Sequence, residues 1–145
     1  TSDGELHVYR GELHIVGHLP LAPNEALPWT GEGELPWAGG RILLMPVIGS
    51  GIQRNLLAEG EVWLKSRQGG ERLQPHARRP RRSLRNLLQE AAIPPWERLR
   101  LPFLWSGRRL VWVGGLGVDT AFACTPGEAG LLPVWEPDYR PESSR

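Results

Sequence analysis

The sequence of 145 residues has one cysteine and no apolar run near the roughly 20 residues that a membrane-spanning helix needs. Because Cys124 has no second cysteine to pair with inside the chain, we expect a reducing compartment, and therefore the cytoplasm. The first 17 residues alternate polar and apolar side chains and lack the basic segment and apolar run of a signal peptide. The sequence therefore predicts no membrane contact.

Residue patterns that carry catalysis or hold a cofactor are also missing. No glycine-rich loop ends in Lys-Ser or Lys-Thr, and no Gly-x-Gly-x-x-Gly opens a predicted helix. The glycines at 114, 115 and 117 favour a tight turn between strands. The four histidines have no partners at metal-ligand spacing, and Cys124 lies in an apolar stretch that favours a buried thiol. We therefore expect no catalytic, metal or cofactor site in this chain.

Glycine and proline are abundant, at 18 and 14 residues, which predicts short strands and many turns. Residues 5–9 and 12–16 alternate in polarity around Arg10-Gly11 and predict a β-hairpin. Residues 18–40 contain four prolines and predict a linker or a meandering surface segment. Further strands are expected at 41–48, 52–57, 61–67, 101–105, 109–113, 118–124 and 132–135.

One amphipathic helix is expected to begin near Pro80 and to end before Pro94-Pro95, because proline suits a first helical turn but cannot continue a helix. It would place an apolar stripe against a core and a polar flank beside it. The stripe is Leu84, Leu87, Leu88 and Ala91, and the flank is Arg81, Arg82, Arg85 and Gln89.

These elements predict an α+β fold in which the basic helix packs on a mainly antiparallel sheet or a small β-sandwich. The predicted organisation has three parts. Residues 1–40 form the hairpin and linker, residues 41–136 form one domain, and residues 137–145 are a fraying tail.

Charge is distributed very unevenly along the chain. Residues 65–109 carry twelve basic and three acidic side chains, whereas the other hundred residues carry five basic and thirteen acidic ones. Eleven of the twelve basic residues are arginines, whose guanidinium groups bind phosphates in a bidentate manner and stack on bases. This basic pole indicates a surface that displaces counterions from a phosphate backbone. There are two alternative interpretations. The basic pole is a solvated surface without a partner, or it belongs to a module that docks an acidic protein through tryptophan anchors.

Five motifs in this half of the chain resemble the C-terminal domain of tRNA(Ile)-lysidine synthases in order and spacing. They are RQGGER at 67–72, SLRNLLQE at 83–90, IPPWER at 93–98, LPFLW at 101–105 and LVWVGGLGVD at 110–119. Each is weak alone, but together they are specific and cover about residues 61–124.

The resemblance implies a non-catalytic piece of a longer enzyme. The full enzymes join lysine to the wobble cytidine of a minor isoleucine tRNA, using ATP bound by an N-terminal domain with a Ser-Gly-Gly-x-Asp-Ser loop that this chain lacks. The C-terminal piece contacts the tRNA acceptor stem and is similar in fold to a sandwich domain of the phenylalanyl-tRNA synthetase β chain. The implied partners are therefore the tRNA(Ile) acceptor stem and the N-terminal domain of the same chain.

The predicted tRNA-binding residues are arginines, because A-form RNA presents mainly phosphates and 2′-hydroxyls to a protein. Arg72 could instead pair with an acidic core group, and Arg98 could form a structural salt bridge. Trp96 is either a core residue or a stacking platform for a base. Lys65, Arg108 and Arg109 are interpreted as solvated strand ends, and Asn86 departs from the lysine usual in the family. The predicted set is Arg67, Arg72, Arg78, Arg79, Arg81, Arg82, Arg85 and Arg98.

Overall fold

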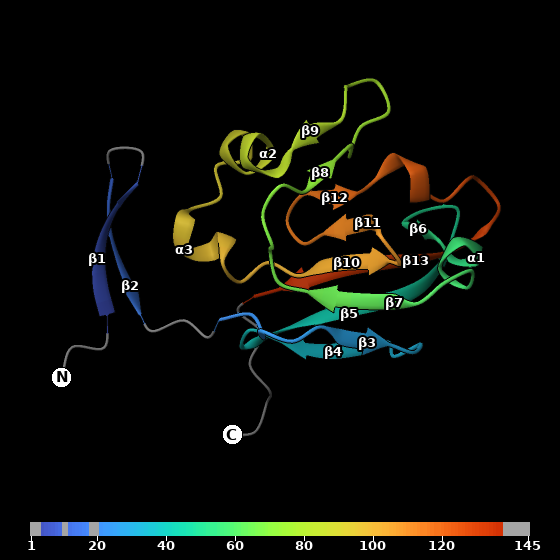
Figure 1. Cartoon of the computed structure of the whole chain (residues 1–145), viewed down its shortest axis with the longest axis horizontal. Helices are drawn as coiled ribbons and strands as arrows, with labels where there is room; N and C mark the ends of the chain where they lie inside the picture. Colours follow the sequence, from blue (N-terminus) through green and yellow to red (C-terminus); the bar gives the residue numbers. More distant parts are fainter. Residues whose placement is uncertain (1–3, 10–11, 18–20, 138–145) are drawn as a thin grey trace.

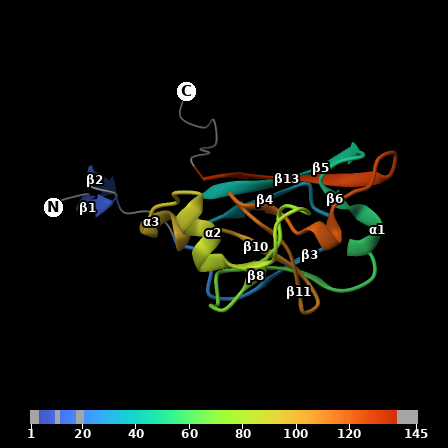
Figure 2. The same cartoon turned by 90° about the horizontal axis from the view of Figure 1, so that it is seen from above.

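Two antiparallel sheets, packed face to face, make up the body of the domain (Figure 1; Figure 2). The computed structural model describes residues 4–9, 12–17 and 21–137. The five-stranded sheet has the order β12 (Gly117–Val118), β11 (Arg109–Val113), β10 (Phe103–Ser106), β7 (Val62–Lys65) and β3 (Leu27–Trp29). The four-stranded sheet has the order β4 (Glu34–Trp37), β5 (Gly40–Ile48), β13 (Ala129–Glu136) and β6 (Ile52–Gln53).

The main core lies between these two sheets, and strand alternation determines which side chains enter it. On β7, Val62 and Leu64 are buried while Trp63 and Lys65 are only partly buried, as the sequence predicts for a strand. On the facing sheet, Ile42 and Leu44 of β5 occupy the same apolar cluster. The predicted α+β sandwich is therefore confirmed.

A third, smaller layer covers the outer face of the five-stranded sheet. It consists of helix α2 (Leu84–Glu90) and a two-stranded ribbon of β8 (Arg72–Leu73) and β9 (Arg82–Ser83) (Figure 1). Leu84, Leu87 and Leu88 of α2 are buried against residues such as Phe103 and Val113 in a second apolar cluster. The predicted helical stripe thus packs as expected, with Ala91 excepted because it is the exposed C-cap.

The helix begins at Leu84, four residues later than the sequence predicts. Arg82 and Ser83 pair with β8 instead, and the Ser83 hydroxyl accepts a hydrogen bond from the Asn86 amide as the N-cap. Arg81 and Arg82 therefore lie before the helix and not on its flank. Helix α2 ends at Glu90, before the double proline, where Ala92 takes a left-handed backbone with φ 58°. The double proline instead starts another helix, because Pro95 occupies the first turn of α3 (Pro95–Arg98).

The segment predicted as a linker contains two strands of the sandwich. β3 pairs with β7 in one sheet and β4 pairs with β5 in the other, so the sheets begin before residue 41. Pro28 and Pro36 are tolerated because β3 and β4 are edge strands. Two other predicted strands are shorter, since β6 runs into helix α1 (Arg54–Leu57) and β12 is followed by the 3-10 turn η1 (Thr120–Phe122).

The predicted N-terminal hairpin is present, with β1 (Gly4–Tyr9) antiparallel to β2 (Glu12–Gly17). Of the predicted tail, residues 138–145 lie outside the described residues. In the part of the chain that the structure describes, no helix is long and apolar enough to cross a membrane.

Candidate nucleic-acid interface

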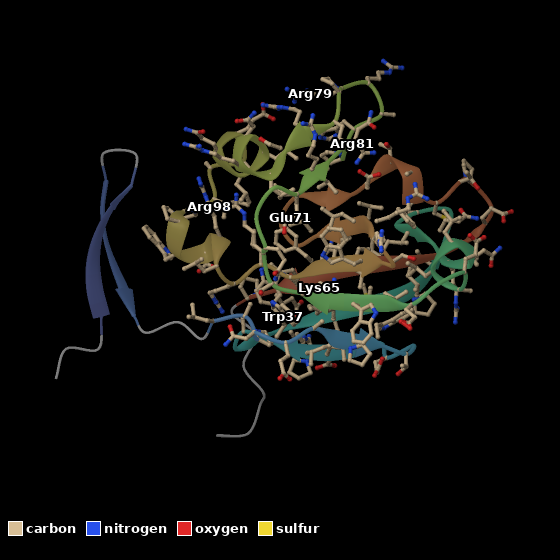
Figure 3. All side chains as sticks on the ribbon, viewed as in Figure 1. Trp37, Lys65, Glu71, Arg79, Arg81 and Arg98 are labelled. Carbon is tan, nitrogen blue, oxygen red and sulfur yellow. The ribbon has the colours of Figure 1, made fainter. Side chains whose placement is uncertain are left out.

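Most of the predicted contact residues come from the third layer. The segment from β8 to the first turn of α2 supplies Arg72, Arg78, Arg79, Arg81, Arg82 and Arg85. Arg67 lies in the loop that leads into this segment. Figure 3 shows Arg79 and Arg81 in the third layer, whereas Arg98 lies apart from them at the end of α3. Six of the eight predicted arginines therefore lie on one continuous segment, residues 72–85, and we call these six arginines the strip.

Two of these arginines converge on the last residue of α2. Arg82 Nη1 lies 2.8 Å from Glu90 Oε2, and the two Nη atoms of Arg79 lie 3.3 Å from its two carboxylate oxygens. The hydrogen bonds from Arg82, followed by those from Arg79, hold the pKa of Glu90 below its ordinary value. A pocket of about 150 Å³ opens beside this cluster. The guanidinium groups are thus held in place, but part of their charge is neutralised within the protein.

Arg81 makes a different type of contact, with a buried acid. Its Nη1 and Nη2 atoms lie 2.7 and 3.3 Å from the carboxylate oxygens of Asp119, which also accepts hydrogen bonds from the amides of Gln74 and Ala121. Burial disfavours the charged form, but the hydrogen bonds from Arg81 and from the two amides outweigh it and lower the pKa of Asp119. Asp119 therefore fastens the third layer to the turn after β12.

The Gly69-Gly70 turn is closed by Glu71, whose side chain is buried (Figure 3). The Glu71 carboxylate accepts hydrogen bonds from the amides of Gln68 and Gly69, at 2.6 and 2.9 Å. The Gln68 and Gly69 amides therefore already have an acceptor within the protein. Arg72 donates to the Arg81 carbonyl at 3.0 Å and not to an acidic core group.

The remaining predicted arginines differ in whether they form hydrogen bonds or ion pairs within the protein. Arg98 Nε donates to the Ile93 carbonyl at 2.7 Å and so closes the turn before α3, which is a structural contact but not a salt bridge. Arg78 and Arg85 are exposed and make no hydrogen bond or ion pair with any residue that the structure describes. Arg67 is half-buried and likewise has no such partner in the described ranges. Arg78 and Arg85 are therefore the most available cations of the strip.

Residues 62–135 match the family model described as the TilS substrate C-terminal domain. The match runs from β7 to β13 and includes the whole third layer. The chain belongs to the TilS substrate C-terminal domain family.

Relatives of this TilS C-terminal domain support the assignment. The chain is 43% identical over 129 residues to a tRNA(Ile)-lysidine synthase of Aromatoleum aromaticum, covering 88% of this chain and 30% of the relative. It is 42% identical over 116 residues to one of Azoarcus sp., covering 80% of this chain and 25% of the relative. The chain thus spans less than a third of these relatives. A crystal structure of a TILS C-terminal domain has the same fold, with a TM-score of 0.63 at 18% identity, covering 80% of this chain and all of that one.

Some basic residues of this TilS C-terminal domain make contacts within the protein that stabilise the fold. Arg100, counted with the basic pole, is buried and donates to the carbonyls of Ala38 and Pro137. The Lys65 ammonium lies 5.4 Å from the Trp105 ring, and Arg109 lies 4.8 Å from that of Phe122. Lys65 and Arg109, interpreted from the sequence as solvated strand ends, thus each contact an aromatic ring. Within the described ranges, no group of three His, Cys, Asp or Glu side chains could hold a metal ion.

The contact between Arg81 and Asp119 predicts how stability depends on pH. Because folding lowers the pKa of Asp119, its contribution is complete above the unfolded value and is lost as pH falls through the folded one. We expect the free energy of unfolding to decrease between about pH 5 and pH 3. The Asp119→Asn variant should lose about 2 kcal/mol at neutral pH and decline less on acidification. Urea unfolding of both proteins at several pH values measures this, and parallel pH curves would contradict it.

Proposed function

We propose that this domain binds the acceptor stem of tRNA(Ile) and helps its parent enzyme to select the tRNA that receives lysidine. The observation that carries the proposal is the arginine strip of the third layer, in which Arg78 and Arg85 are exposed and unpaired within the described part of the chain. The names of the relatives support tRNA as the ligand, because they are tRNA(Ile)-lysidine synthases. The domain would work beside the catalytic part of the same cytoplasmic enzyme, where ATP and lysine are used.

The strip suits the backbone of an A-form helix better than its base edges. A-form RNA has a narrow major groove that side chains do not read, so a protein surface contacts phosphates and 2′-hydroxyls. Arg78 lies on the loop between β8 and β9, and Arg85 lies on the first turn of α2. Because the two guanidinium groups project from different elements of one layer, they can reach separate phosphates of one strand. Arg79 and Arg82 add further contacts once a phosphate replaces Glu90.

We expect the double variant Arg78→Gln/Arg85→Gln to bind tRNA(Ile) more weakly and with less dependence on salt. Each lost phosphate contact should lower the slope of log K against log salt by roughly 0.7–0.9. The fold should be unaffected, since neither side chain packs in an apolar cluster of the described residues. Fluorescence anisotropy at several salt concentrations measures the change. Arg54→Gln on α1 is the matched control, because it removes one exposed arginine outside the strip.

The choice of RNA tests the acceptor stem. We would compare minor tRNA(Ile), a variant with a mismatched acceptor stem, and elongator tRNA(Met). A preference for tRNA(Ile) that is lost with the altered stem supports the proposal. Equal binding to all three RNAs would show that the strip is a non-specific basic patch that does not recognise the acceptor stem. If none bound, the strip would have to dock an acidic protein instead.

A further inference from the structure

A basic hollow at the edge of the strip combines two of its arginines, Arg72 and Arg81, with Arg108 and Arg109, which were not among the predicted contact residues. It has a volume of about 350 Å³ and lies between the turn joining β10 to β11 and the ribbon of β8 and β9. Four guanidinium groups line it, from Arg72, Arg81, Arg108 and Arg109, together with the carboxylate of Asp119. The turn and the ribbon are far apart in the sequence, so only the fold brings these arginines together.

Three of the four arginines are already held in position. Arg72 donates to the Arg81 carbonyl, Arg81 forms the bidentate contact with Asp119, and Arg109 lies over the Phe122 ring. Arg108 is exposed and has no hydrogen-bond or ion-pair partner among the described residues. A ligand would therefore meet a largely preformed set of cations, which lowers the entropy cost of binding.

The hydrogen-bonding groups around the hollow leave an excess of donors. The two carboxylates of its lining already accept hydrogen bonds, Asp119 from Arg81 and two amides, and Glu71 from the Gln68 and Gly69 amides. On the donor side, the buried indole Nε1 of Trp105 has no acceptor among the described residues, and Arg108 and Arg109 keep their N–H groups. An acceptor-rich anion such as phosphate satisfies this imbalance, whereas a cation or a further donor does not.

We propose that this hollow binds a phosphate group of the RNA, as a contact point separate from Arg78 and Arg85. The inference rests on the proposed function, because the ligand is a phosphate of the same RNA. Arg81 belongs to both the strip and the hollow, so one RNA strand lying along the strip reaches the hollow without leaving the surface. The phosphate is either an internal phosphodiester or a terminal phosphomonoester.

The test is the double variant Arg108→Gln/Arg109→Gln of the full chain, with the Asp119 contact left intact. Its affinity for a tRNA(Ile) transcript should fall roughly tenfold, as expected when a charge-assisted contact to phosphate is lost. Thermal unfolding verifies that the variant is folded, and Arg54→Gln should bind as the wild type does. The Arg78→Gln/Arg85→Gln variant is measured in the same assay.

Removing the 5′-phosphate from the transcript identifies the source of the phosphate. If the wild type then loses affinity and the double variant does not, the hollow holds the terminal phosphomonoester. If the difference between the two proteins is unchanged, it holds an internal phosphodiester. The Arg108→Gln/Arg109→Gln variant could instead bind the RNA as tightly as the wild type, in an assay where Arg78→Gln/Arg85→Gln weakens binding. That result would overturn the phosphate site in the hollow but leave the proposed function intact. Absence of RNA binding by the wild type would overturn both.

Discussion

Replacing Arg100 with methionine is expected to lower the free energy of unfolding by about 3 kcal/mol. The Arg100 side chain is 2% exposed and donates to the carbonyls of Ala38 and Pro137, at 3.0 and 2.8 Å. It also pairs with Glu97 at 3.0 Å. Methionine retains the apolar stem but supplies no donor, so both carbonyls and the carboxylate lose their partner in a part of the protein that water enters poorly. Buried polar groups without partners are among the most destabilising changes.

Thermal and urea unfolding measure this effect, which corresponds to a decrease in Tm of roughly 6–12 °C for a domain of this size. Arg98→Met is the matched control, because Arg98 lies on the same short segment and donates to one carbonyl, that of Ile93. We expect it to cost about 1 kcal/mol. If both variants lost equal stability, the contacts of Arg100 with Ala38 and Pro137 would not be the cause.

The elements that the sequence predicts well are those determined by local periodicity. The stripe of Leu84, Leu87 and Leu88 determines which face of α2 is buried, and the alternation of Val62 and Leu64 does the same for β7. Such patterns depend on neighbouring residues alone. The start of α2 was predicted wrongly because pairing with β8, a tertiary contact, takes Arg82 and Ser83 out of the helix.

The partners of the arginines depend on contacts distant in sequence, so composition alone does not reveal them. Arg81 and Asp119 are 38 residues apart, and the contact that buries Arg100 against Ala38 spans 62 residues. The sequence therefore predicts a basic surface, and it offers structural alternatives for Arg72 and Arg98, but it does not identify the partner of any arginine. The structure separates Arg100, which stabilises the fold, from Arg81, which ties two elements, and from Arg78 and Arg85, which are exposed.

The Glu90→Gln variant should bind RNA more tightly than the wild type, by about tenfold at low salt. In the free domain the Glu90 carboxylate neutralises Arg79 and Arg82, so an RNA phosphate must displace it before it can bind them. Glutamine keeps the size of the side chain and removes its charge. Two more guanidinium groups then become available, and the slope of log K against log salt should steepen by roughly 0.7–0.9 for each new contact.

The same anisotropy titrations measure this gain, and Glu59→Gln is the matched control. Glu59 is exposed and makes no ion pair with any described residue, so its neutralisation changes the net charge by the same amount but frees no arginine. A gain shared by both variants would assign the effect to net charge alone. A loss of affinity in folded Glu90→Gln would mean that Glu90 orients Arg79 and Arg82 for RNA. Only a gain specific to Glu90 establishes that this acid competes with the phosphate for the two arginines.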